Sequence, residues 1–242
     1  RFDVVPKGHK GDLWLYVISH SFLVRADEGT PLVQLRLFNA DTRFGQVETT
    51  LAMREYQLLW STAGTPYSVD DIKITDNDGM CILTLDTECN PVGWRARRSS
   101  PLINLAHIGA YDPTAFFESV EIRDEYMYLD EGFYIFSTRE YVRVPPQLAC
   151  EMQPTDDRSG EFRAHYAGFI DPGWGWGASG EGKGRPLTLE VRPFEKMLVG
   201  RGRPIAKIGF ERMAEVPETL YDTGTPNYGT QSGPRLAKQF KQ

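Results

Sequence analysis

The chain has 242 residues, of which 40% are hydrophobic and 25% are charged, and its formal net charge is −6. A chain of this length can bury a sizeable core, and because no apolar run approaches the length of a membrane span, we expect a globular protein with no membrane partner. The acidic balance argues against sequence-independent binding to nucleic acid, since neutralising phosphates requires a basic face.

Strand-like segments dominate the chain. They share many β-branched and aromatic residues, frequent alternation of apolar with polar positions, and ends marked by Gly, Pro or Asp-Gly, as at the tight turn predicted for Asp78-Gly79. In chain order they are residues 12–24, 80–88, 132–144, 186–194 and 204–213. Short strands with few helices predict an all-β sandwich or barrel.

Helical periodicity is confined to two places. Residues 47–60, VETTLAMREYQLLW, place apolar side chains at helical spacing, with Thr49 or Thr50 as candidate N-caps. A shorter helix is predicted after Asp112-Pro113. The longer helix therefore interrupts an otherwise strand-rich chain.

An internal repeat is the most informative feature of the organisation. Residues 29–38, GTPLVQLRLF, align with residues 202–211, GRPIAKIGFE. At nearly the same distance upstream, LWLYV (13–17) aligns with LTLEV (187–191), and RFDVVPKG aligns loosely with GFIDPGWG. Three blocks in one order indicate two copies of one unit.

The two copies differ in length. The second continues far upstream of its Asp171, whereas the first begins at Asp3, so we expect the rest of the first copy to precede Arg1. We divide the chain into the C-terminal part of a first repeat, a helical linker and a second repeat, which span residues 1–42, 43–66 and 67–242.

Cysteine usage indicates the compartment. Cys81, Cys89 and Cys150 are odd in number and lack CxxC spacing, which predicts neither a disulfide framework nor a cysteine zinc site. No charged-then-apolar leader follows Arg1, so no secretory signal is visible. We therefore expect a cytoplasmic protein.

A glycine-rich stretch leaves two interpretations open. Residues 167–184, AGFIDPGWGWGASGEGKG, could form a surface hairpin loop, or a bare backbone that approaches a ligand while Asp171 accepts a hydroxyl hydrogen bond. The spacing matches neither GxGxxG nor a Walker loop. Its second half, GWGASGEGKG, has no counterpart in the first repeat, and we expect a mobile insertion that could lie over a site.

Glu190 is the candidate acid-base residue. In a strand, Leu187, Leu189 and Val191 share one face, and Thr188 and Glu190 share the other. Glu190 is then either a solvated surface residue or, if its face lines a pocket, a carboxyl whose pKa is raised by desolvation. Tyr16 holds the equivalent place in the first repeat, so the copies would not be chemically equivalent.

Two polar segments carry weaker signals. Residues 154–166 include Ser159 and His165, but no GxSxG, HExxH or HxE…PCxxC pattern accompanies them, so a serine nucleophile or a zinc hydrolase is poorly supported. Residues 221–242 form either a frayed tail or a lid that orders over a polyphosphate.

Taken in order, HYAGFIDPGWGWG, PLTLEV, GRPIAKIGFERM and YGTQSGPRLAKQF resemble the dCTP deaminase branch of the trimeric dUTPase-like superfamily. RFDVVPKGHKG and GWRARRSSPLINLAHIGAYDPTAFFE fit the same branch. The match covers essentially the whole chain, which is similar to the long, two-repeat bacterial 2′-deoxycytidine 5′-triphosphate (dCTP) deaminases.

The resemblance implies a dUTPase-like β-clip, a distorted jelly-roll barrel, assembled as a homotrimer with active sites between repeats or subunits. It implies hydrolytic deamination of dCTP to dUTP and ammonia with no catalytic metal, and Mg²⁺ bound only through the triphosphate. Glu190 matches the catalytic glutamate, which takes a proton from water and delivers it to the cytosine ring and the leaving amine.

The same resemblance assigns the substrate-binding residues. Asp171 would bind the deoxyribose 3′-hydroxyl, and the adjoining chain, Ala167, Gly168, Phe169, Ile170 and Trp174, would bracket the sugar and base. Tyr228, Gln231 and Lys238 match the tail that closes over the triphosphate, and Arg158 falls on the second arginine of a family motif.

That motif, an arginine, two serines and a later arginine, is otherwise absent, because Pro154 and Thr155 stand at the serines. We hypothesise that the first repeat supplies the serine-arginine half from residues before Arg1, while Glu190 supplies the base. Two other functions remain open: dUTP pyrophosphatase activity, alone or combined with deamination, and a non-catalytic nucleotide-binding trimer module.

Overall fold

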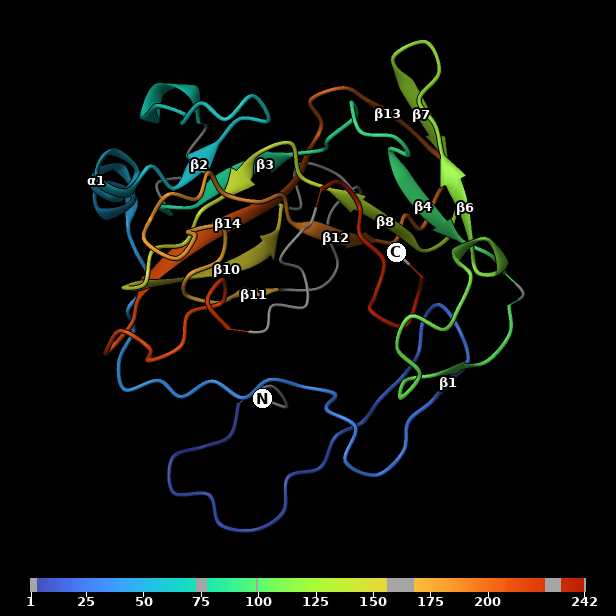
Figure 1. The fold of residues 1–242 in the computed structure, drawn as a ribbon, viewed down its shortest axis with the longest axis horizontal. Helices are drawn as coiled ribbons and strands as arrows, with labels where there is room; N and C mark the ends of the chain where they lie inside the picture. Colours follow the sequence, from blue (N-terminus) through green and yellow to red (C-terminus); the bar gives the residue numbers. More distant parts are fainter. Residues whose placement is uncertain (1–3, 73–77, 99, 156–167, 225–231, 242) are drawn as a thin grey trace.

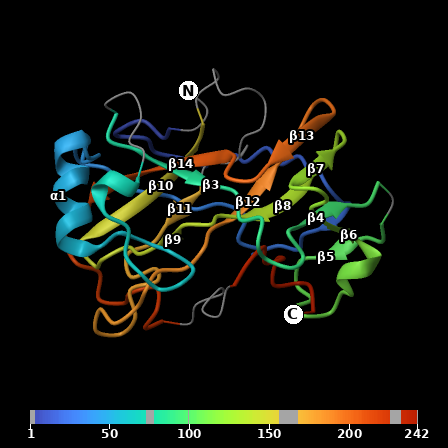
Figure 2. The same ribbon diagram turned by 90° about the horizontal axis from the view of Figure 1, so that it is seen from above.

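The computed structural model describes residues 4–72, 78–98, 100–155, 168–224 and 232–241, and its regular elements are mostly strands (Figure 1). Two four-stranded antiparallel sheets lie side by side, and among the described residues the one α-helix sits at the outer end of the first sheet (Figure 2). The all-β class predicted from the sequence is confirmed.

The first sheet has the strand order β11-β10-β14-β3. Its strands are β3 (Cys81–Thr84), β10 (Leu148–Pro154), β11 (Phe169–Ile170) and β14 (Pro204–Arg212). The second sheet has the order β12-β8-β4-β6. It contains β4 (Gly93–Ala96), β6 (Phe117–Val120), β8 (Tyr134–Ser137) and β12 (Thr188–Val191). Strands predicted over 80–88, 132–144, 186–194 and 204–213 are thus present, in shorter form.

Three two-stranded ribbons and two 3₁₀ turns complete the fold. A parallel ribbon joins β1 (Val24–Arg25) to β5 (Ile103–Asn104). Antiparallel ribbons join β2 (Leu59–Trp60) to β9 (Tyr141–Val142), and β7 (Tyr126–Leu129) to β13 (Met197–Gly200). The 3₁₀ turns are η1 (Val69–Asp71) and η2 (Pro113–Ala115), so the short helix predicted after Asp112-Pro113 is a single turn leading into β6.

Helix α1 (Gln46–Tyr56) begins one residue earlier and ends four residues sooner than predicted. Its N-cap is Gly45, whose N–H donates to the Glu48 carboxylate at 2.9 Å, and not Thr49 or Thr50. Thr49 is buried inside the first turn, where its hydroxyl donates to the Gly79 carbonyl at 2.7 Å. Side-chain burial therefore overrides the capping preference of threonine.

Strand β8 divides the apolar interior in two. Tyr134 and Phe136 face a large core built from both sheets, whereas Ile135, which alternates with them, faces a second cluster. The other buried members of that cluster are Phe22, Ile103, Phe116, Phe117, Leu236 and Phe240. The sheet containing β12 is consequently covered on both faces.

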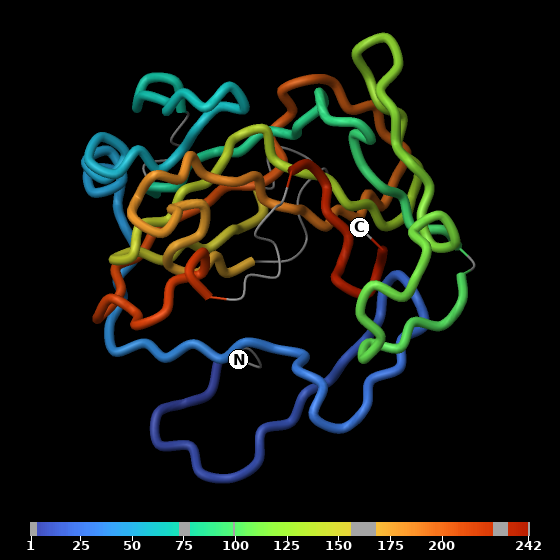
Figure 3. The backbone as a smooth tube through the Cα atoms, viewed as in Figure 1, coloured from blue at the N-terminus to red at the C-terminus, as the bar shows by residue number. Residues whose placement is uncertain are grey.

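The strand predicted over 12–24 is wrong except at its end. Only Val24 belongs to a strand, and most apolar side chains before it lie in solvent, as Trp14 does with 92% of its surface exposed, whereas Phe22 is buried in the second cluster. The tube in Figure 3 shows this part of the chain, in dark blue, looping away from the sheets. A strand forms only where a neighbour pairs with its backbone, and within the described residues no strand pairs with residues 12–22.

The two segments that align best in the internal repeat also differ in structure. Residues 202–211 supply most of β14, but their counterparts, residues 29–38, form no strand and are largely exposed. Similar sequence patterns thus adopt different structures because only the second copy lies between partner strands.

Candidate active site

Glu190 lies in the middle of β12, directly opposite Ile135 of β8. Paired residues on antiparallel strands share a face, so the Glu190 side chain points away from the large core. Leu187, Leu189 and Val191 are buried, each with at most 5% of its surface exposed. The alternation predicted for this strand is confirmed.

The face that carries Glu190 opens into a cavity of about 370 Å³. Six of its lining residues were assigned to the site from the sequence: Gly168, Phe169, Ile170, Asp171, Trp174 and Glu190. The remainder are Gln34, Ile135, Met152, Leu187, Thr188, Tyr221, Arg235 and Ala237. Strands from both sheets, the Asp-Pro-Gly loop and the C-terminal tail therefore meet at one place.

Two carboxyl groups in this cavity have perturbed protonation. The Glu190 side chain keeps contact with solvent, yet the surrounding protein removes enough water to raise the pKa of its carboxyl. Desolvation also raises the pKa of the half-buried Asp171 carboxyl. Both groups accordingly hold a proton to higher pH than they would in water, which suits Glu190 to proton transfer near neutral pH.

Backbone hydrogen bonds fix the Asp-Pro-Gly loop at the cavity wall. The Gly173 N–H donates to the Val144 carbonyl at 3.0 Å, and the Val144 N–H donates to the Trp174 carbonyl at 2.8 Å. Gly173 has a φ of +89°, and a Cβ there would lie 2.6 Å from that of Leu220. A glycine is thus required by both conformation and space.

Trp174 follows in the same wall with 7% of its surface exposed. Its ring packs 4.9 Å from that of Tyr221, and its buried indole N–H has no hydrogen-bond partner among the described residues. Of the two interpretations of the glycine-rich stretch, the ligand-facing one fits its first half, since Gly168 to Asp171 and Trp174 line the cavity.

The second half of the stretch packs away from the cavity, so the option that it lies over the site is not realised. None of residues 175–184 lines the cavity. Trp176 stacks on the Arg143 guanidinium at 4.0 Å, and Arg143 donates to the Gly180 carbonyl at 2.5 Å and to the Tyr56 carbonyl at 2.6 Å. These contacts anchor the insertion against α1 and β9.

The C-terminal tail reaches the cavity through Arg235 and Ala237. The Arg235 N–H donates to the Thr188 hydroxyl at 3.3 Å, two residues from Glu190. Lys238 does not line the cavity; it is exposed, and its carbonyl accepts a hydrogen bond from Gly109. The other assigned residues, Arg158, Ala167, Tyr228 and Gln231, lie outside the described residues.

Several lining residues were missed from the sequence. Strand alternation could have found Thr188, which shares the face of Glu190. Gln34 and Tyr221 come from segments that are distant from Glu190 in sequence, and no local sequence pattern predicts that they line the cavity. Gln34 is the one cavity residue from the part assigned to the first repeat.

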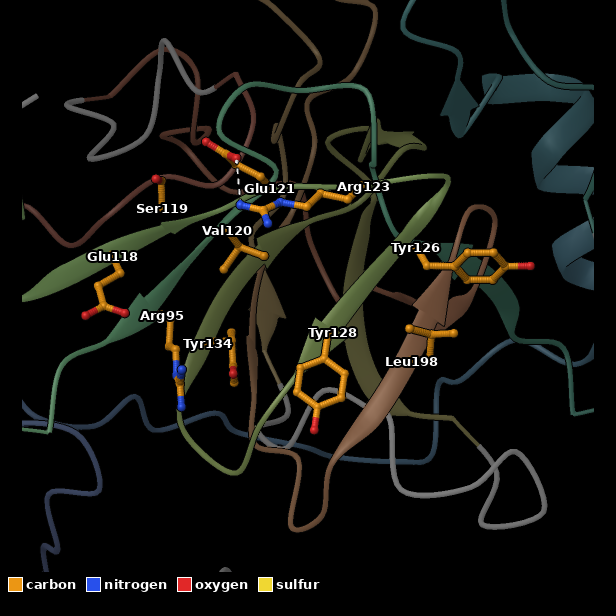
Figure 4. A pocket seen from close by; sticks show the side chains of 10 residues that line it. All are labelled: Arg95, Glu118, Ser119, Val120, Glu121, Arg123, Tyr126, Tyr128, Tyr134 and Leu198. Carbon is orange, nitrogen blue, oxygen red and sulfur yellow. Dashed lines mark ion pairs between the residues drawn. The ribbon is translucent and has the colours of Figure 1, made fainter.

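A second cavity, of about 550 Å³, lies on the opposite face of the sheet (Figure 4). Arg95 and Tyr134, which form a cross-strand pair, line it and alternate with Trp94 and Ile135 of the Glu190 face. None of the residues assigned to the site lines this larger space. Size alone therefore does not identify the site, and the desolvated carboxylates favour the smaller cavity.

Neither a metal-binding cluster nor a membrane-spanning helix is found among the described residues. No group of three or more His, Cys, Asp or Glu side chains in this part of the chain is arranged to hold a metal ion. No helix there is long and apolar enough to cross a membrane.

Comparison with known proteins gives a consistent result. The model of the 2′-deoxycytidine 5′-triphosphate deaminase (DCD) C-terminal domain matches residues 64–240, and that of the DCD N-terminal domain matches residues 1–41. No curated protein matches the chain. Among solved structures, the chain resembles the crystal structure of 2′-deoxycytidine 5′-triphosphate deaminase from Agrobacterium tumefaciens, with 28% sequence identity and a TM-score of 0.62.

That structural match covers 74% of the present chain but 51% of the solved one, so the present chain spans about half the length of this relative. The observed strands are consistent with the dUTPase-like all-β fold that the sequence motifs imply.

Proposed function

The chain belongs to the 2′-deoxycytidine 5′-triphosphate deaminase family, and we propose that the cavity around Glu190 converts dCTP and water to dUTP and ammonia. The observation that carries the proposal is the placement of Glu190, a desolvated carboxyl beside the Asp-Pro-Gly loop on the one strand face that opens into this cavity. A proton shuttle is needed there because neither water nor an amine leaving group is adequate at neutral pH.

In the proposed reaction, the ionised Glu190 carboxylate takes a proton from a water molecule as the water oxygen bonds to C4 of cytosine. Glu190 then passes this proton to the ring nitrogen N3, which gives a tetrahedral intermediate. It next takes the proton of the new C4 hydroxyl and delivers it to the amino group. The C–N bond breaks, ammonia leaves, and the C4 carbonyl of dUTP forms, so every atom and proton is accounted for.

The cavity walls suggest how the nucleotide is held. We propose that the Asp171 carboxylate accepts a hydrogen bond from the deoxyribose 3′-hydroxyl, and that the backbone from Ala167 to Ile170, with Trp174, brackets the sugar and base. Arg235 lines the same cavity and offers positive charge to the phosphates. The tail residues Tyr228, Gln231 and Lys238, together with Arg158, are proposed to close over the triphosphate.

Mg²⁺ is proposed to enter with the triphosphate and to neutralise part of its charge. All proton transfers are assigned to Glu190. We further propose that the protein assembles as a homotrimer and acts in the cytoplasm, as the family resemblance implies.

Product analysis tests the function directly. The protein is incubated with dCTP and Mg²⁺, and dCTP, dUTP, dUMP and ammonia are quantified over time. We expect dUTP and ammonia in equal amounts. Accumulation of dUMP would indicate pyrophosphatase activity instead or in addition, and bound but unreacted dCTP would indicate a nucleotide-binding module.

A further inference from the structure

Gln34 brings the first-repeat segment into the Glu190 cavity. Residues 29–38 run as an extended, unpaired stretch, seen in light blue below β10 and β11 in Figure 1. Gln34 lines the cavity together with Met152 of β10 and Phe169 of β11. The wall on this side is therefore built by chain that lies about 150 residues from Glu190 in sequence.

Arg36 fastens this stretch to the first sheet. Its guanidinium donates to Glu151 at 2.8 Å and to Glu211 at 2.9 Å, and it lies 4.4 Å from the centre of the Phe169 ring. Between residues 31 and 41, Arg36 is the only residue that is partly buried. The position of Gln34, two residues earlier, consequently depends on the contacts of Arg36.

Two carboxylates hold the Arg36 guanidinium in place. Glu151 and Glu211 project from neighbouring strands, β10 and β14, and the Arg36 side chain bridges them. Desolvation raises the pKa of Glu211, and the positive charge of Arg36 opposes that rise. Without Arg36, Glu151 and Glu211 would lose the guanidinium that bridges them, and the stretch would lose its attachment.

We propose that Gln34 contacts the nucleotide and contributes to substrate specificity, and that Arg36 is the positioning residue that holds it there. The Gln34 amide offers both a donor and an acceptor to the uncharged part of the ligand. In the repeat alignment, Gln34 and Arg36 correspond to Lys207 and Gly209, so the second copy has neither group. This inference rests on the deaminase function proposed above.

The test measures dCTP affinity in the Glu190→Gln background, where binding is separated from turnover. Calorimetry gives the Kd of this parent and of the added substitution Gln34→Ala. Loss of one hydrogen bond predicts a Kd about three- to tenfold higher. Val33→Ala serves as the matched control, because Val33 is 71% exposed on the same stretch and does not line the cavity, and we expect its Kd to equal that of the parent.

Arg36→Met distinguishes a positioning role from a separate structural one. We expect Arg36→Met to weaken dCTP binding at least as much as Gln34→Ala does. Once Arg36 is lost, adding Gln34→Ala should change the Kd by less than about twofold, since the amide has already left the cavity. Unfolding curves of all variants show whether the fold is kept.

Three results would overturn the inference. An unchanged Kd in Gln34→Ala refutes the contact while leaving the deaminase function standing. If the fold-changes in Kd caused by Arg36→Met and by Gln34→Ala multiply in the double variant, the two residues act independently, and the positioning role is refuted. If the parent binds no dCTP at all, the proposed function fails, and the inference fails with it.

Discussion

Thr138 holds the start of β12, and its loss should loosen the strand that carries Glu190. Its side chain is fully buried, and its hydroxyl accepts the Leu187 N–H at 2.9 Å while donating to the Glu140 carbonyl at 2.8 Å. Thr138→Val keeps the shape of the side chain and removes both bonds. The Leu187 N–H is then buried without an acceptor.

An orphaned buried donor costs about 1–3 kcal/mol, and the added methyl group of valine offsets only part of this loss. We therefore expect Thr138→Val to lower the free energy of unfolding by about 1–3 kcal/mol in urea denaturation at unchanged m-value. Turnover of dCTP should fall as well, because Thr188 and Glu190 follow directly in the strand.

Thr138→Ser is the matched control. It keeps the hydroxyl and loses one methyl group, at a cost of about 1 kcal/mol, so both hydrogen bonds to Leu187 and Glu140 survive and turnover should be retained. If Thr138→Val were as stable as the wild type within about 0.5 kcal/mol, the hydroxyl would not hold β12, and the reasoning would be refuted.

Further predictions concern the cavity itself. Glu190→Gln should lower the kcat for dCTP by about 10²- to 10⁴-fold and leave its Kd nearly unchanged, as steady-state kinetics and calorimetry can check. Desolvation raises the folded-state pKa of Glu190 above its ordinary value of 4.5, so ionisation of this carboxyl lowers the stability of the fold as the pH rises from 4.5 through the folded-state pKa. Glu190→Gln should thus melt higher than the wild type at neutral pH, and the difference should vanish as the pH falls below 4.5. Trp174→Phe removes an indole N–H with no described partner, so the free protein should lose only the stability of the missing ring volume, about 1–2 kcal/mol in urea denaturation; a higher Kd for dCTP would indicate that the N–H binds the ligand. Gly173→Ala should destabilise by at least about 2 kcal/mol, since it adds a Cβ against Leu220 at positive φ, whereas Gly132→Ala, with space and ordinary φ, should stay within about 0.5 kcal/mol; equal unfolding midpoints would contradict this.

The sequence predicts the strands of residues 67–242 well because their signals are local. Alternation over residues 186–194 places Leu189 in the core and Glu190 on the opposite face, and both assignments are confirmed. The Asp-Pro-Gly motif likewise predicts a constrained turn, which Gly173 adopts. Each of these features depends on neighbours within a few residues.

Features that depend on distant partners are predicted poorly. Residues 12–24 have strand-like alternation, but only Val24 finds a partner strand among the described residues, so most of the apolar side chains before it stay in solvent. Gln34 reaches the cavity only because Arg36 meets Glu151 and Glu211, a contact between segments more than 100 residues apart. The sequence around Gln34 alone does not predict this long-range ion-pair contact.

The insertion shows the same limit. The glycines of residues 175–184 predict a mobile loop, yet Trp176 and Gly180 are held by Arg143, which directly follows β9. Glycine content therefore describes what the backbone can adopt, and tertiary contacts decide what it does adopt.

The position of bound dCTP tests most directly whether the Glu190 cavity is the active site. A crystal structure of the Glu190→Gln variant with dCTP and Mg²⁺ should place C4 of cytosine within one water molecule of residue 190 and the 3′-hydroxyl beside Asp171. Nucleotide bound in the cavity of Arg95 and Tyr134, or with its base turned away from residue 190, would contradict the assignment.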